Sequence, residues 1–287
     1  MLLARNNPRS GHQPGIVRYH RAMTRLARVL ACVAIAGVPA SLARAADDPL
    51  AKARQLYNQR QYEAAINAAE QARLIPQRAD AADLVAARAY LERFRLSVAS
   101  DDLTNARDRL ARLDPQRLAP RERAEYIIGL GETLYLDGAY GAAANIFDSI
   151  LNSGDLQAAG GRERVVDWWA DALDRDARPR PDIDRQNVYH RIRTRMEEEI
   201  AVRPGNGAAL YWLASAARAQ GDLQAAWDAV EAGWVRAPLA GDRATALRED
   251  LDRLMLRGIV PERARAVGQP PQTLQADWER FKERSRR

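Results

Sequence analysis

Cysteine and histidine are scarce in this chain. Of its 287 residues only Cys32 is a cysteine, and three are histidines. One cysteine cannot form an intramolecular disulfide or supply the several thiolates of a typical structural zinc site. His190 is the one histidine after residue 45, and no serine or cysteine motif accompanies it. We therefore expect no nucleophile–base pair and no metal or cofactor site.

A long apolar run is also missing. The run from Val29 to Val38 has ten residues, whereas a membrane-spanning helix needs about 20. Arg25 and Arg28 precede this run, and Ala43-Arg44-Ala45 follows it. This order of a basic segment, an apolar segment and small residues is typical of a secretory signal peptide. The pattern predicts cleavage after Ala45 and a periplasmic or secreted protein.

Residues 1–45 are therefore expected to be an N-terminal extension plus signal peptide. The start of translation can lie at Met1 or at Met23. Two alternatives remain open, an uncleaved membrane anchor and a lipid attached to Cys32. In the main interpretation the membrane is a partner only through the leader, before cleavage.

Neither sign of charge is in excess once the leader is set aside. The whole chain has 44 basic and 38 acidic residues, and residues 1–45 hold seven arginines but no acidic residue. The remainder therefore has 37 basic and 38 acidic residues. A nucleic-acid-binding protein normally shows a basic footprint, so we expect no nucleic acid partner.

A repeated pattern of small and apolar residues is present instead. The positions Leu130, Gly131, Leu134, Gly138, Tyr140, Ala143 and Phe147 recur, with identical offsets, as Leu213, Ala214, Ala217, Gly221, Leu223, Ala226 and Val230. A third copy is Ala53, Leu56, Tyr62, Ala65, Ala69 and Ala72. Small residues are needed where two helices cross, because a large side chain pushes the axes apart. Gly131→Leu or Ala226→Leu should therefore destabilise the protein by overpacking, typically by about 1–3 kcal/mol.

This pattern resembles the tetratricopeptide repeat (TPR) family, whose unit is a helix–turn–helix of about 34 residues. The resemblance implies an all-α fold, a right-handed superhelical solenoid of TPR-like helix pairs closed by a C-terminal capping helix. Residues 46–258 would form the array. Its units are expected at about 46–77, 79–123, 124–157, 158–206 and 207–240. The two lengthened units are 79–123, with helices near 80–97 and 102–113, and 158–206, whose extra residues we place in a protruding loop at Arg178–Asp182.

The end of the chain carries two further predicted helices. One, at about 242–257, is expected to cap the array. Residues 259–287 are predicted to be a linker followed by an amphipathic helix, with Leu274, Trp278 and Phe281 on one stripe. We expect this helix to dock back on the array, while a place in the groove and contact with a partner are the alternatives.

In the proteins that this array resembles, the first helix of each pair faces a concave groove. Carried over position by position, the groove residues are Arg54, Tyr57 and Asn58; Glu125, Glu132 and Tyr135; Asp171, Asp174 and Arg175; and Tyr211, Ser215 and Arg218. The aspartates at 174, 176, 182 and 184 alternate with arginines at 175, 178, 180 and 185. Such mixed charge indicates a solvated, balanced loop rather than a metal site.

The resemblance implies an exported, non-enzymatic protein–protein interaction scaffold in the bacterial cell envelope. Its partner would be a protein or peptide bound in the concave groove. Two alternatives stay open. One is an enzyme or enzyme subunit that acts on envelope polymer through groove carboxylates such as Asp171 and Asp174. The other is a structural subunit that self-associates through its C-terminal helix.

Overall fold

The computed structural model describes residues 48–285, and this part of the chain is helical throughout, with no strand. The prediction of an all-α fold is therefore confirmed for the described residues. The leader predicted at residues 1–45 lies outside them. Among the helices of residues 48–285, none combines the length and the apolar character that crossing a membrane requires.

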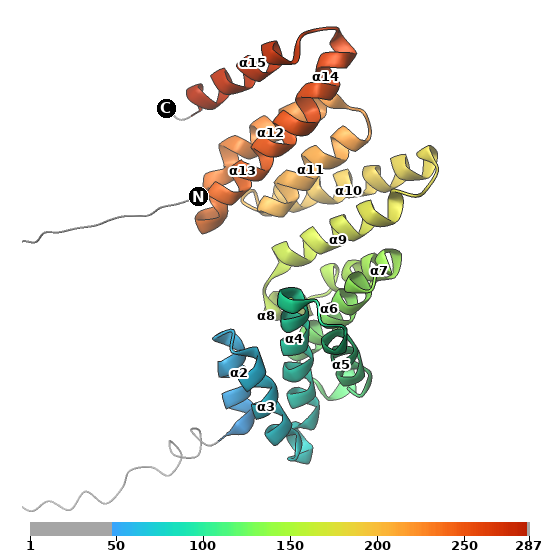
Figure 1. The fold of residues 1–287 in the computed structure, drawn as a ribbon, viewed down its shortest axis with the longest axis vertical. Coiled ribbons are helices and arrows are strands. Elements are labelled where there is room, and N and C mark those ends of the chain that lie inside the picture. Colours follow the sequence, from blue (N-terminus) through green and yellow to red (C-terminus); the bar gives the residue numbers. More distant parts are fainter. Residues whose placement is uncertain (1–47, 286–287) are drawn as a thin grey trace, which may run out of the picture. The chain divides into compact units, whose positions relative to one another are not determined.

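The helices follow one another in pairs (Figure 1). Their bounds are α2 (Pro49–Asn58), α3 (Tyr62–Arg73), α4 (Ala79–Ser97), α5 (Ser100–Ala111), α6 (Pro120–Leu136), α7 (Tyr140–Leu151), α8 (Asp155–Ala159), α9 (Arg162–Ala177), α10 (Asp182–Val202), α11 (Gly207–Ala219), α12 (Leu223–Arg236), α13 (Ala244–Leu254), α14 (Val260–Val267) and α15 (Pro271–Arg284). Short 3₁₀ turns lie at Pro76–Arg78, Pro115–Arg117 and Ala237–Arg243. A helix pair is present in each of the five predicted units.

Neighbouring pairs pack on one another in chain order. The second helix of one pair contacts the first helix of the next, as in α3 with α4, α7 with α9 and α10 with α11. First helices also contact first helices, namely α2 with α4, α4 with α6 and α9 with α11, and α11 contacts α13, the predicted capping helix. The first helices therefore lie next to one another along most of the array.

The three clearest repeat copies make the same turn between their two helices. Gly138 and Gly221 have positive φ angles of 80° and 78°, and Arg60, at the matching position of the first copy, has a φ of 60°. The next residue in each copy closes the turn with a backbone bond to the residue five positions earlier, as in Ala139 N to Leu134 O at 2.9 Å. The matching bonds are Gln61 N to Leu56 O and Asp222 N to Ala217 O. The sequence repeat is thus a repeat of backbone structure.

Small residues of the pattern lie where paired helices cross. A Cβ atom added to Gly131 in α6 would lie 2.5 Å from Phe147 of α7. Phe147 is fully buried, and its ring is 5.7 Å from that of Trp168 in the next pair. Glycine at position 131 therefore lets α6 and α7 approach closely.

Several predicted boundaries need correction. The third unit begins at Pro120, earlier than the predicted residue 124, because proline starts a helix well and Glu122 accepts a bond from Ala119 N at 3.2 Å. The helix expected at 102–113 is two residues earlier, at Ser100–Ala111.

The extra residues of the fourth unit do not form a protruding loop. They lengthen α9 to 16 residues and α10 to 21, and only residues 178–181 connect the two helices. Ion pairs four residues apart, Arg178 with Asp174 and Arg180 with Asp176, support the last turns of α9.

The linker expected at the start of 259–287 is largely helical. The chain passes from α13 through a π-helical turn at Met255–Ile259 into α14, and the helix ends at Gly268, whose φ is 66°. Pro261 does not end the helix because it lies in the first turn of α14, directly after the wider π turn.

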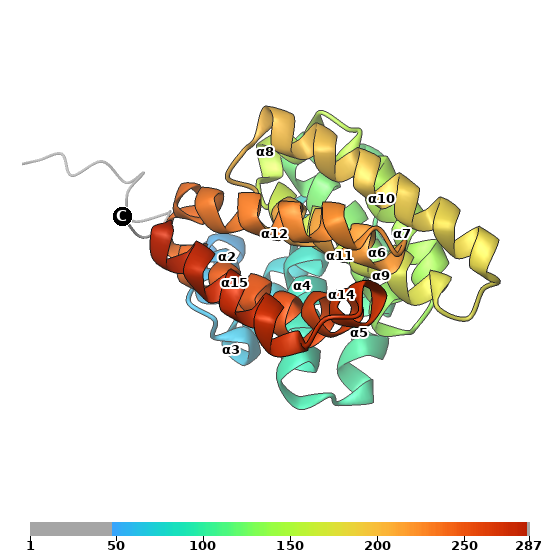
Figure 2. The same ribbon diagram turned by 90° about the horizontal axis from the view of Figure 1, so that it is seen from above.

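The prediction that the last helix docks back on the array is confirmed. Helix α15 turns back from the end of α14 (Figure 2). Its Trp278 side chain is fully buried, lies 5.3 Å from the ring of Trp234 in α12, and donates from Nε1 to Asp252 of α13 at 2.7 Å. Lys282 also contacts Asp252 at 2.7 Å.

Candidate functional site

Within residues 48–285, at least four cavities follow the first helices of the pairs. Cavity A, of about 360 Å³, lies among α2, α4 and α6. Cavity B, of about 580 Å³, lies between α4, α6 and the start of α9. Cavity C, of about 300 Å³, lies among α9, α11 and α13, and cavity D, of about 670 Å³, extends along α9 and α11 toward α14.

Neighbouring cavities share walls. Tyr57 and Arg88 line both A and B, Glu163 and Arg243 line both B and C, and Tyr211 lines both C and D. The four cavities therefore adjoin one another along the first helices, and we name the depression that this row of cavities marks the first-helix groove.

Most of the predicted groove residues line this depression. Cavity A holds Arg54, Tyr57 and Asn58, and cavity B holds Tyr57, Glu125 and Glu132. Cavity D holds Asp171, Asp174, Tyr211, Ser215 and Arg218. The structure thus brings side chains from the first, third, fourth and fifth units to the adjoining cavities of the first-helix groove.

Tyr135 and Arg175 instead stabilise the contact between two first helices. The Tyr135 hydroxyl of α6 donates to Asp171 of α9, and Arg175 Nε donates to the same carboxylate at 2.6 Å. Tyr140 packs on Tyr135, with ring centroids 5.5 Å apart. Asp171 is therefore held between two donors.

Internal partners also hold Asp174 and Arg218. Asp174 accepts from the Tyr189 hydroxyl at 2.9 Å and from Arg178 at 2.5 Å. Arg218 makes two bonds to Glu262 of α14, at 3.1 and 2.5 Å. Cavity D is therefore rimmed by charges that already neutralise one another.

The other sequence candidates are His190 and the aspartates around the turn between α9 and α10, of which Asp174 lines cavity D. His190 is exposed on α10. Of the aspartates around the turn between α9 and α10, Asp174, Asp176 and Asp182 each form an ion pair with an arginine of the same turn. This pairing agrees with a balanced, solvated turn.

The wall of cavity A combines apolar contact with ion pairs. Ala81, Leu84 and Val85 of α4 give it an apolar side. Arg54 pairs with Glu122, and Glu125 accepts from Arg88 at 2.7 Å and from Arg121 at 3.2 Å. An extended peptide could lay apolar side chains on α4 and exchange polar contacts with these pairs.

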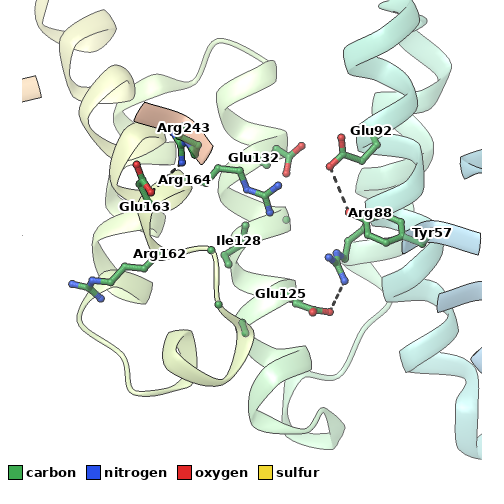
Figure 3. Close-up of a pocket in the computed structure, with 14 residues that line it drawn as sticks. Tyr57, Arg88, Glu92, Glu125, Ile128, Glu132, Arg162, Glu163, Arg164 and Arg243 are labelled. Carbon is green, nitrogen blue, oxygen red and sulfur yellow. Dashed lines mark hydrogen bonds and ion pairs between the residues drawn. The ribbon is translucent and has the colours of Figure 1, made fainter. Parts of the chain in front are cut away.

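Cavity B concentrates charged side chains from three helices (Figure 3). The Arg88 guanidinium lies 4.4 Å from the centre of the Tyr57 ring. Arg95 contacts two carboxylates, Glu92 at 2.9 Å and Glu132 at 2.5 Å. Glu92 and Glu132 point toward one another in Figure 3, so one guanidinium serves both carboxylates.

Glu132 is a buried carboxylate in the wall of cavity B. Its side chain is 9% exposed. Burial is the main cause that raises the pKa of the Glu132 carboxyl to about 7; Arg95 lowers this pKa, and Glu92 contributes to raising it. The charge of this wall therefore changes near neutral pH.

Cavity C is lined by more acidic than basic side chains. Glu163, Asp167 and Asp250 face a single arginine, Arg243, which lies 3.1 Å from Glu163. Asp167 accepts from Trp212 Nε1 at 2.8 Å, and burial raises the pKa of its carboxyl.

The sequence did not predict that the second unit and the start of α9 contribute residues to the first-helix groove. Arg88 and Glu92 have the same spacing of four residues as Arg54 and Asn58, which was the one available signal on α4. Arg164 became part of cavity B through the short helix α8 and the following Gly160–Gly161 turn, which the repeat pattern does not contain.

No protein-family model matches this chain, and its comparisons with curated proteins and with solved structures give no significant match. The groove geometry therefore carries the functional proposal.

Proposed function

We propose that the protein is an exported, non-enzymatic TPR-like solenoid that binds a protein or peptide in its first-helix groove. The observation that carries this proposal is the row of cavities A to D, in which neighbouring cavities share lining residues and to which the first helices of all five pairs contribute. Repeat arrays use such continuous surfaces to bind extended partners. The shared turn of the three clear copies supports a repeated array.

The composition of the groove favours a polar, extended ligand. Tyrosines and arginines, which are frequent at binding hot spots, line cavities A, B and D. Apolar wall is concentrated in cavity A, while cavity B is rich in ion pairs. A peptide with alternating apolar and charged side chains would match this order.

Export to the bacterial envelope is the second part of the proposal. It rests on the leader pattern of residues 1–45. N-terminal sequencing of the protein recovered from the envelope fraction tests it, and the expected first residue is Ala46. A mature chain that retains residues before Ala46 would contradict cleavage after Ala45.

Self-association through α15 has less support. Leu274 and Trp278 of its apolar stripe are buried within their own chain, so the stripe is largely covered.

Groove binding can be tested by filling the cavities. Asn58→Tyr and Ser215→Tyr add bulk at cavities A and D, where neither side chain forms a hydrogen bond within the described residues. The matched control is His190→Tyr, on the exposed face of α10. Affinity capture from envelope extract should yield a discrete protein partner with the wild-type chain and the control, and lose it with the filled variants. Retention by both filled variants would place binding elsewhere.

A further inference from the structure

One side of cavity B presents an uncommitted positive charge. Arg164 stacks on Trp168, with its guanidinium carbon 5.0 Å from the ring centre, and it forms no ion pair within the described residues. The other arginines of the wall are paired: Arg88 with Glu125, Arg162 with Glu199, and Arg243 with Glu163. Arg164 is thus the wall arginine left for a ligand.

The same side contains the start of α9. Arg164 belongs to the first turn of this 16-residue helix, and its N-cap residue, Gly161, has no side chain to cap the first backbone N–H groups. The positive end of the helix dipole therefore adds to the charge of Arg164. A carboxylate could accept bonds from both.

Another part of the wall presents two carboxylates, Glu92 and Glu132, that share the guanidinium of Arg95. The Glu132 side chain is more than nine-tenths buried and lines the cavity. Its Oε1 atom is ion-paired with Arg95 at 2.5 Å but has no partner with the geometry of a hydrogen bond. Arg95 is shared with Glu92 as well. A buried carboxylate oxygen without a hydrogen bond is costly, and a donor from a ligand would relieve that cost.

We propose that cavity B binds a small zwitterion, with its ammonium group at Glu92 and Glu132 and its carboxylate at Arg164 and the start of α9. The volume of about 580 Å³ falls within the range of small-molecule sites, roughly 300–1,000 Å³. A free amino acid and the two ends of a short peptide share this chemistry. This site is distinct from the proposed binding of a protein or peptide partner, because cavity B in the middle of the groove would bind a separate small ligand.

Binding of the ammonium group at this site requires the ionised form of the Glu132 carboxyl. The groups that face its carboxyl are Tyr57 of α2, Arg88, Glu92 and Arg95 of α4, and Arg164 of α9. An ammonium group beside Glu132 stabilises the ionised carboxylate, so the ligand lowers a pKa that is about 7 in the empty site. Binding therefore releases a proton below pH 7, and affinity rises roughly tenfold from pH 6 to pH 8.

Titration calorimetry on the full chain tests this proposal. The probes are glycine, L-alanine, L-lysine and alanyl-alanine, with N-acetylalanine and alaninamide as analogues that lack one charge. At least one free probe should bind saturably, and both blocked analogues should fail. Preference for alanyl-alanine over alanine identifies peptide ends as the ligand, and the reverse preference identifies a free amino acid.

Two variants and a control locate the binding. Arg164→Ala should weaken binding at least tenfold, because it removes a charge-assisted contact. Arg164 is exposed, so this variant should fold. Arg280→Ala, on an exposed arginine of α15, should leave binding unchanged. Glu132→Gln should abolish the rise in affinity with pH.

Failure of every free probe to bind, equal binding of N-acetylalanine, or unchanged binding by Arg164→Ala would each overturn the zwitterion site. None of these results affects the capture experiment at cavities A and D, so the two proposals fail separately.

Discussion

Replacing Gly131 with alanine has two opposing effects on stability, a gain in helix propensity and a loss from overpacking at the α6–α7 crossing. Alanine in a helix interior is more favourable than glycine by about 1 kcal/mol. At position 131, however, the new Cβ atom would lie 2.5, 2.8 and 3.0 Å from three ring atoms of Phe147. The ring is fully buried and rests against Trp168, so it has little room to move.

The structure therefore predicts a net loss of stability. Overpacking of this kind typically costs about 1–3 kcal/mol. After subtraction of the helix propensity gain of about 1 kcal/mol, Gly131→Ala should lower the free energy of unfolding by up to about 2 kcal/mol.

A second glycine of the same helix provides the control. A Cβ atom on Gly129 would meet the Leu110 side chain at 3.4 Å, which is ordinary contact. Gly129→Ala should thus be neutral or more stable by up to about 1 kcal/mol. Urea unfolding monitored by circular dichroism measures both variants. If Gly131→Ala proved as stable as Gly129→Ala, the account of the α6–α7 crossing would be wrong.

Three further predictions concern the turn, the last helix and the buried carboxylate. Arg60 and Gly138 both have positive φ. Arg60→Gly should therefore stabilise the chain by about 0.5–1 kcal/mol, and Gly138→Ala should destabilise it by about 1 kcal/mol. Equal effects of the two substitutions in urea unfolding would refute the shared turn. Trp278→Ala should cost about 3–5 kcal/mol in the same assay, whereas the exposed Arg280→Ala should stay within about 0.5 kcal/mol, and a neutral Trp278→Ala would argue against the docked α15. The pKa of Glu132 is raised above its unfolded value of 4.5 to about 7, so its contribution to stability decreases as pH rises across that window. The unfolding free energy of Glu132→Gln relative to wild type should accordingly increase from pH 5 to pH 8, and a pH-independent difference would contradict the raised pKa.

The sequence predicted those parts of the fold that depend on local chemistry. The helix pairs follow from the spacing of small residues and from turn glycines such as Gly138, whose φ of 80° explains why glycine is favoured there. Helix α10 stops at Val202, two residues before Pro204, as that proline predicts.

Parts set by contacts distant in sequence were not predictable. The continuation of the helix past Pro261 depends on the π turn, where Gly258 leaves room for the Arg218 side chain from α11. Arg218 pairs with Glu262, which is 44 residues away, so no local pattern could show that its charge is already neutralised.

Cavity B also depends on contacts between residues that are distant in sequence. Glu132 was identified from its repeat position, but its shared guanidinium comes from Arg95 in a unit whose repeat signal is weak. Arg164 reaches the cavity because α8 and the Gly160–Gly161 turn interrupt the repeat. The position of Arg164 in cavity B therefore depends on these interruptions of the repeat rather than on the repeat pattern.

Site-specific photo-crosslinking tests the central claim most directly. A photoreactive side chain placed at Ser215, in cavity D, is compared in envelope extract with the same side chain at His190, on the exposed face of α10. If the first-helix groove binds a protein or peptide, the label at Ser215 should yield a discrete crosslinked partner and the label at His190 should not. Equal crosslinking from both positions, or a partner trapped from His190 alone, would contradict groove binding.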